Sequence, residues 1–260
     1  MANCTVHLIK LTSAPNPKDF IRKLKPSSAL IKGIPYGWVH KPRSLHTNEL
    51  LGSKWDLFLL TESNISMDPF QAAIETHITI PVTIPPEQFE TLKQQITTTP
   101  APSQKTPPLP THWTSPQSHI PQEELVETRS TPLSVGELRL DNPMAEFLSN
   151  ALPQDHRDRP ACFFNLFKYK NDDRSTHDSY MQGFKNTFGD AAGASVKFMG
   201  PVRDVGNAWD DANLVQYDSV WHYAYMLSTD VYKELNKEKV AGLEDTCILL
   251  VGETEPAGGK

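Results

Sequence analysis

Hydrophobic and polar positions alternate most regularly between residues 162 and 253. This segment opens with CFFNLFKYK, in which both alternating sets are largely apolar, as in a strand covered on two faces. Tyr180, Phe184 and Phe188 then recur every four residues, which predicts one face of a helix. The later strand-like runs are ASVKFMG, ANLVQY and, after a helical pattern that begins at Ser219, DTCILLVGE. The predicted order is βαββαβ, the ferredoxin-like split unit.

The first 96 residues repeat this order less regularly. Their strand-like runs are CTVHLIKL, IPYGWVHK, WDLFLLTES and HITIPVTI, and their helical runs are PKDFIRKL and DPFQAAIE. CTVHLIK can be overlaid on CFFNLFK, which places Cys4 on Cys162 and His7 on Asn165. Each half also enters its third strand through a Trp-Asp pair. We therefore predict an internal duplication, since one such sheet cannot bury both of its faces alone.

A composition change separates the two halves. Residues 97–134 are rich in Pro, Thr and Ser, so we expect an extended or disordered linker, with Trp113 as the one residue suited to docking. The predicted domains are 1–96, a diverged ferredoxin-like unit, and 135–260, a helix followed by the second unit. That helix is expected at 142–152, with Asn142 as its cap.

Charge and composition restrict the partners. The chain has 260 residues, a net charge of -6 and no Lys/Arg-rich run, which argues against nucleic acid. It lacks a signal-peptide pattern and any apolar run near the ~20 residues that span a bilayer, so we expect a cytoplasmic protein without a membrane partner. Three cysteines, Cys4, Cys162 and Cys247, lie in strand-like runs and are expected to pack in the core.

The second unit resembles the domain-of-unknown-function 1330 family of the dimeric α+β barrel superfamily. The resemblance rests on NLFKYK, GASVKFMG, WDDANLVQYDS, YMLSTDVY and AGLEDTCILL, in that order. The whole chain is also similar to longer fungal proteins in which this unit follows a diverged N-terminal half. Met199 and Gln216 depart from the family, which often has an Arg and an acidic residue at these positions.

The resemblance implies two four-stranded sheets that face each other, with helices outside and a small-molecule pocket between the sheets. The predicted fold class is therefore α+β, with tandem ferredoxin-like βαββαβ units forming an intramolecular dimeric α+β barrel. We expect a monomer with an internal pseudo-dimer, or a homodimer. The superfamily includes cofactor-free monooxygenases, polyketide cyclases, haem-degrading enzymes and non-catalytic binding or stress proteins.

Strand parity predicts which side chains reach that pocket, because neighbouring residues point to opposite faces. We assign Cys162, Phe164 and Leu166 to the helix-covered face of their strand. The residues assigned to the pocket as ligand-binding groups are Phe163, Asn165, Phe167, Met199 and Gln216, together with Tyr36 and Trp38, which we place on one face of their strand.

Two of the inward side chains are candidate catalytic residues. His7 is suited to acid–base work near neutral pH, although a histidine hydrogen-bonded to nearby backbone fits the same position. Lys197 could hold an enolate or carboxylate, or could simply reach solvent at the barrel mouth. Asn165 and Gln216 could orient a carbonyl or bond each other. His177 is expected in solvent near a helix start.

These observations predict a protein that binds a small hydrophobic, oxygenated, polyketide-like metabolite. The activity considered is that of a cofactor-independent cyclase, isomerase or monooxygenase. The alternative is a non-catalytic structural or stress-related interaction protein whose barrel is filled by its own side chains. A haem-handling protein would need an inward histidine with open space beside it. We predict no cofactor and no metal, because no phosphate-binding loop, HExxH motif or spaced carboxylate cluster is present.

Overall fold

The structure is a computed structural model and describes residues 1–13, 16–24, 29–63, 66–97, 109, 116–120, 133–188, 193–203 and 209–253. Trp113, suggested above as a docking residue, lies outside this part of the chain. Within the described ranges no helix is both long enough and apolar enough to span a bilayer.

The N-terminal unit contains four strands and only short helices. Its strands are β1 (Ala2–Leu11), β2 (Ile31–His40), β3 (Leu57–Glu62) and β4 (Ile74–Ile84). The helices are α1 (Pro17–Lys23), α2 (Thr47–Leu51) and the 3-10 helix η2 (Asp68–Ala73). Asp68–Ala73 of the helical run DPFQAAIE thus form a 3-10 helix.

Three further helical segments lie between the units. The first is α3 (Pro86–Thr97), and the 3-10 helix η3 (Pro116–His119) and α4 (Asn142–Asn150) follow. Asp141, not Asn142, caps α4, because its side chain accepts a hydrogen bond from the Met144 amide. Ile120 is buried in one cluster with residues of α4, so this part of the Pro-rich stretch packs on the C-terminal unit.

The C-terminal unit follows the predicted order with one division. Its elements are β5 (Ala161–Tyr169), α5 (Ser175–Phe188), β6 (Ala194–Pro201), β7 (Asp211–Tyr217), α6 (Val220–Leu227), α7 (Asp230–Gly242) and β8 (Leu243–Glu253). The single expected second helix is split into α6 and α7, with Ser219 and Thr229 as their respective N-caps. Two short 3-10 turns flank β5 at Gln154–His156 and Lys170–Asp172.

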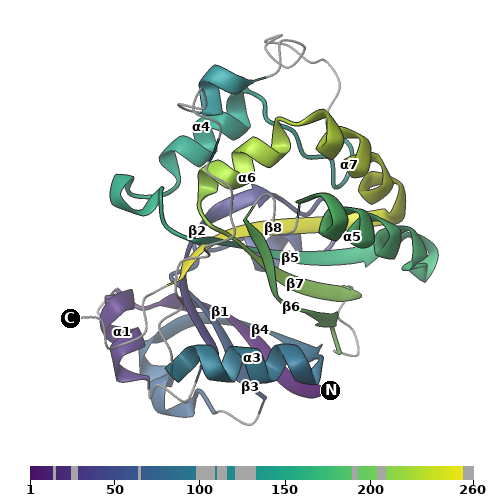
Figure 1. The fold of residues 1–260 in the computed structure, drawn as a ribbon. Coiled ribbons are helices and arrows are strands. Elements are labelled where there is room, and N and C mark those ends of the chain that lie inside the picture. The colour runs from purple at the N-terminus through teal and green to yellow at the C-terminus, as the bar shows by residue number, and fades with distance from the viewer. Residues whose placement is uncertain are drawn as a thin grey trace.

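All eight strands belong to one sheet with the order β4-β1-β3-β2-β8-β5-β7-β6. Each unit contributes the same order, fourth-first-third-second, and antiparallel pairing of β2 with β8 joins the units. Figure 1 shows the two halves of the sheet facing each other, with α4, α5, α6 and α7 outside the C-terminal half. The predicted fold class, a tandem ferredoxin-like α+β barrel within one chain, is confirmed.

The two edge strands approach each other and close the barrel. Val82 of β4 forms a bridge with Val202, and the Arg203 amide donates a 3.0 Å hydrogen bond to the Pro81 carbonyl. A Cβ placed on Gly200 of β6 would lie 1.7 Å from the Thr83 carbonyl oxygen. Only glycine therefore permits this close backbone approach.

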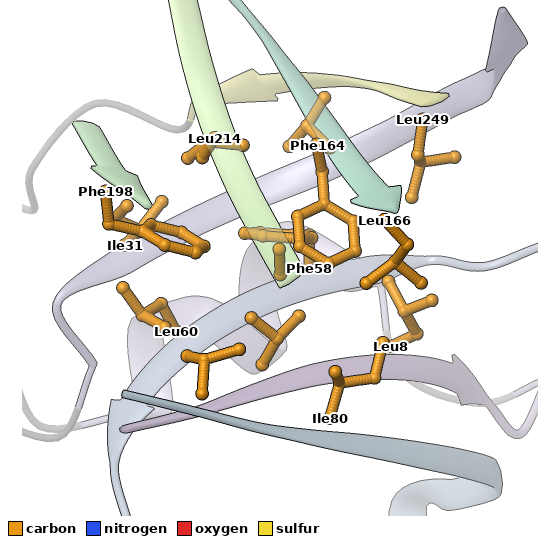
Figure 2. Packing of buried hydrophobic residues seen from close by; sticks show 14 of the residues in the cluster. Leu8, Ile31, Phe58, Leu60, Ile80, Phe164, Leu166, Phe198, Leu214 and Leu249 are labelled. Atoms are coloured by element: carbon orange, nitrogen blue, oxygen red, sulfur yellow. The ribbon is translucent and has the colours of Figure 1, made fainter. Parts of the chain in front are cut away.

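Apolar side chains from both units fill the barrel interior (Figure 2). The Phe58 and Phe164 rings, one from each unit, lie 5.2 Å apart. Other interior residues in Figure 2 are Leu8, Ile31, Leu60, Ile80, Leu166, Phe198, Leu214 and Leu249. The interior is therefore the main core of the molecule. A ligand pocket between the sheets was the expectation, and the side chains described here occupy that space instead.

The predicted parity of β5 is wrong. Cys162, Phe164 and Leu166 point into the barrel interior, whereas Phe163 lies in the cluster under the helices. The physical reason is that both faces of β5 are buried, so its two alternating sets are equally apolar and do not reveal which one meets the helices.

Bulges change the predicted parity of two other strands. A register shift lies between Val196 and Phe198 of β6, and Phe198 points into the interior instead of toward the helices. Shifts in β2 place Tyr36 against the cluster under the helices and Trp38 against the barrel interior. These two aromatic residues therefore lie on opposite faces, not on one.

Candidate functional site

His7 lies on the outer face of the N-terminal half of the sheet, where it is 4 % exposed. Its Nδ1 is 2.8 Å from His77 Nε2, and its Nε2 is 2.9 Å from Thr61 Oγ1. Burial, followed by the neighbouring His77, lowers the pKa of His7 to about 4. His7 is therefore a neutral imidazole with both nitrogens engaged, and it does not point into the barrel as predicted.

The other predicted site residues are dispersed. Lys197 is the extra residue of the β6 bulge, and its Nζ lies 3.2 Å from Gln95 Oε1 of α3. The Tyr36 hydroxyl lies 3.0 Å from His156 Nδ1. Gln216 lies two residues after the interior-facing Leu214, on the same face of β7, and is half-buried. Lys197 and Tyr36 thus meet different neighbours, and the predicted set does not form one site between the sheets.

Three predicted residues do meet, but on the opposite side of the sheet. Phe163, Asn165 and Phe167 line a cavity of about 40 Å³ between the sheet and helices α5, α6 and α7. We call this cavity the buried chamber. Its other lining residues that matter here are Asn213, Tyr223 and Lys239.

The polar side chains of the buried chamber come from sheet and helix. Asn165 Nδ2 donates a 2.7 Å hydrogen bond to Asn213 Oδ1 and a 2.9 Å bond to the Phe163 carbonyl, which fixes its amide. The Tyr223 ring stacks on Phe163 with centroids 3.9 Å apart. Within the described ranges, the buried Tyr223 hydroxyl has no hydrogen-bond partner.

Lys239 is the most unusual residue of the chamber. It is 2 % exposed, and no carboxylate of the described chain pairs with its ammonium group. Burial lowers the pKa of Lys239 to about 7. A large fraction of Lys239 is therefore the uncharged amine near neutral pH.

His177 lies close to Lys239 and is also buried without a partner. It is 0 % exposed, and neither ring nitrogen has a hydrogen-bond partner among the residues that the structure describes. Its ring lies 4.4 Å from that of Phe167. Burial, with the charges of Lys239 and Arg174, lowers the pKa of His177 to about 3. The expectation that His177 is exposed is wrong, because α5 turns it onto the sheet.

A wider groove opens beside the chamber, between α5 and β6. It has a volume of about 860 Å³ and is lined by polar residues including Arg174 and Asp178 and by the apolar Met199. We call it the open groove. Met181 and Phe184 of α5 line both cavities, so these two side chains form the wall between them. Methionine is flexible, so Met181 is suited to move aside.

An ion pair between the buried Asp211 and the partly exposed Arg174 lies at this groove. The Tyr169 hydroxyl donates a 2.6 Å hydrogen bond to Asp211, and the Arg174 guanidinium lies 3.0 Å from the same carboxylate. Burial raises the pKa of Asp211, although Tyr169 and Arg174 oppose this. Arg174 also pairs with Asp178 at 2.9 Å. Asp211 of the WDD motif therefore holds Arg174, which lines the open groove. Asp211 is itself bonded to Tyr169 of β5.

Asp245, in the AGLEDT run, joins the two units. It accepts hydrogen bonds from the backbone amides of Arg43, Ser44 and Leu45, at 2.9 to 3.2 Å, in the segment after β2. Burial alone would raise the pKa of Asp245, but these bonds hold it below its ordinary value. This motif residue thus has a structural role between the halves.

Sequence reasoning missed Lys239 and His177. Tyr232, Asn236 and Lys239 are spaced by four and three residues, which places them on one buried face of α7. Two of the three are polar, so hydrophobic patterning alone does not reveal this face. The signal available in the sequence was the spacing of Asn236 and Lys239 from the aromatic Tyr232.

The sequence matches no family model and no curated protein. Three solved structures have low similarity to this chain. A protein of unknown function from Rhodopseudomonas palustris is 20% identical with a TM-score of 0.39, covering 47% of this chain and 99% of that chain. A "putative monooxygenase" from Fusobacterium nucleatum is 8% identical with a TM-score of 0.48, covering 99% and 95%. A protein of the same description from Lactobacillus acidophilus is 6% identical with a TM-score of 0.44, covering 97% and 94%.

Proposed function

We propose that this chain binds a small oxygenated organic molecule under the helices of the C-terminal unit. The ligand's oxygen-bearing end enters the buried chamber, and its hydrophobic remainder lies in the open groove. The observation that carries this proposal is Lys239, a buried amine without a carboxylate partner in the described chain, in a cavity that shares a wall with an open groove. Buried polar groups without partners are costly, which favours a role in binding.

The chamber size restricts which part of the ligand it holds. One water needs about 10–15 Å³ of such volume, so a cavity of about 40 Å³ has room for roughly three waters. A carbonyl or carboxyl group has this size. Lys239 and the Tyr223 hydroxyl are suited to its oxygen, and Met181 and Met199 are suited to an apolar tail.

The same groups support chemistry without a cofactor. An amine with a pKa of about 7 exchanges a proton readily at neutral pH and, when protonated, stabilises a developing enolate. We extend the proposal to a cofactor-independent isomerisation, cyclisation or oxygenation of a hydrophobic, polyketide-like substrate. Membership in the 1330 family is part of the same proposal and rests on the quoted motifs.

Mass spectrometry of small molecules that copurify with the protein tests this proposal. The wild-type protein should retain an oxygenated hydrophobic compound that Lys239→Met loses, because the variant removes the polar end of the site. Lys237→Met is the matched control, since Lys237 lies exposed on the same helix and pairs with Glu234. Equal retention by folded Lys239→Met and wild type would contradict the assignment.

One observation favours the second candidate, a non-catalytic interaction protein. The barrel interior is filled by side chains of both units, as that alternative requires. The two candidates differ in the chamber. If no compound copurifies and hydrophobic alcohols, aldehydes and acids leave the wild-type Tm unchanged, the interaction protein is the better description.

A further inference from the structure

Among the described residues, Lys239 lies near two histidines and pairs with no carboxylate. Burial is the main cause that lowers the pKa values of His177 of α5 and His40 of β2, to about 3 and about 4, and the nearby Lys239 charge adds to it. His40 Nε2 accepts a 3.4 Å hydrogen bond from the Gly136 amide, as a neutral imidazole does. The Asp245 carboxylate opposes the lowering of the His40 pKa, but it already accepts hydrogen bonds from the Ser44 and Leu45 amides. Nothing in the described chain therefore holds Lys239 in its charged form.

The Lys239 stem is buried next to the backbone of Gly136. A Cβ placed on Gly136 would lie 3.9 Å from Lys239 Cε, an ordinary contact distance. Lys239 itself is 2 % exposed and lines the buried chamber. The amine therefore cannot escape to solvent by a simple rotation, as surface lysines do.

We propose that Lys239 Nζ forms a reversible imine with an aldehyde or ketone held in the buried chamber. This inference rests on the proposed function and names its substrate class. The Nζ lone pair attacks the carbonyl carbon as the C–O π bond opens, and one N–H proton is transferred to that oxygen to give a carbinolamine. The carbinolamine C–O bond then breaks, and the oxygen leaves as water with a second proton, which the loss of the remaining N–H proton from Nζ balances. Carbon and nitrogen are then joined by a double bond, with no net oxidation or reduction.

The chamber supplies what these steps need. A desolvated, uncharged amine is the nucleophilic form of lysine. The unpartnered Tyr223 hydroxyl lines the same chamber, and the proposal assigns it the transfer of a proton to the departing oxygen. Asn165, whose Nδ2 donates to Asn213 and to the Phe163 carbonyl, forms part of the polar wall. The small volume favours a terminal aldehyde, whose hydrophobic chain passes Met181 and Phe184 into the open groove.

Reductive trapping tests the inference on the full chain. The protein is incubated with hexanal and sodium cyanoborohydride at pH 7, digested, and mapped by mass spectrometry. We expect Lys239 to be alkylated at least about tenfold faster than the exposed Lys237, because its uncharged fraction is far larger at this pH. Hexanol in excess should slow labelling of Lys239 and leave Lys237 unaffected. Lys239→Arg should remove the fast site, whereas Lys237→Arg should keep it.

The outcomes separate this inference from the proposed function. If hexanol raises the wild-type Tm but hexanal labels Lys239 no faster than Lys237, imine formation is wrong and non-covalent binding stands. If neither compound has an effect on Tm or labelling, both proposals fail. Because the rates are compared within the wild-type chain, the result does not depend on whether a Lys239 variant folds.

Discussion

Asp56 and Asp210 occupy equivalent positions in the two units and accept the same hydrogen bond. Asp56 Oδ2 accepts a 2.8 Å bond from the Leu11 amide, and Asp210 Oδ2 accepts a 2.7 Å bond from the Tyr169 amide. A register shift lies immediately before both Leu11 and Tyr169, at the ends of β1 and β5. The aspartate of each Trp-Asp pair thus satisfies an amide that the irregular strand end leaves available.

This equivalence predicts that the two aspartates stabilise their units alike. Asp56→Ala and Asp210→Ala should each lower the free energy of unfolding by about 1–3 kcal/mol, because a partly buried amide loses its acceptor. Denaturant unfolding of the full chain measures this. Glu90→Ala, an exposed change on α3, should stay within about 0.5 kcal/mol of wild type. If Asp56→Ala and Asp210→Ala lowered the free energy of unfolding no more than Glu90→Ala does, the stabilising role of the two aspartates would be wrong.

Closure of the barrel predicts a strong effect at Gly200. Gly200→Ala should destabilise the protein by roughly 1–3 kcal/mol or more, because the added methyl group overlaps the Thr83 carbonyl and must push β4 and β6 apart. Thermal or denaturant unfolding measures the loss. Ser195→Ala, exposed on the same strand, is the control and should change little. A Gly200→Ala protein as stable as this control would show that the strands do not meet there.

The unpartnered ring nitrogens of His177 predict a stabilising substitution. His177→Leu should raise the free energy of unfolding at pH 7 by about 1–3 kcal/mol, because it removes buried polar atoms that lack partners. The folded pKa of about 3 lies below the ordinary 6.5, so the unfolded state binds more protons between these values. Wild-type stability should therefore fall as the pH drops from 6.5 toward 3, more steeply than that of His177→Leu in denaturant titrations. A less stable variant at pH 7 would contradict this.

Lys239 predicts a change of the same sign in a higher pH window. Its folded pKa of about 7 lies below 10.5, so the unfolded state holds an extra proton on this group between these values, and the contribution of Lys239 to stability rises with pH across that range. His177 and His40 stay neutral and Asp245 and Arg174 stay charged there. Lys32, Cys4 and Cys247 also have shifted pKa values, so the contribution of Lys239 is measured against a variant.

The comparison with Lys239→Met isolates this contribution. The variant should be more stable than wild type at pH 7, and the difference should shrink by roughly 2 kcal/mol between pH 7 and pH 9. Denaturant unfolding of both proteins at the two pH values gives the difference, in which other titrating groups cancel. A difference independent of pH would show that Lys239 keeps an ordinary pKa.

The sequence by itself determined the element order and the two-unit architecture. Period-two and period-four patterns and N-caps such as Ser219 depend on residues close together in the sequence. They can therefore be recognised without knowing which surface each element packs against. The two units have matching strand orders, as the predicted fold requires, and the residue-by-residue overlay of CTVHLIK on CFFNLFK remains a prediction. The boundaries of the 97–134 linker remain a prediction.

Only the tertiary structure decided which face of each strand meets the helices. On β5 both sets of side chains are apolar and buried, so Phe164 and Phe163 were equally suited to either side. The candidate site depends on the same choice. It forms where α5 and α7 bring His177 and Lys239 over Asn165, and burial of a charged side chain follows from distant packing, not from its neighbours in sequence.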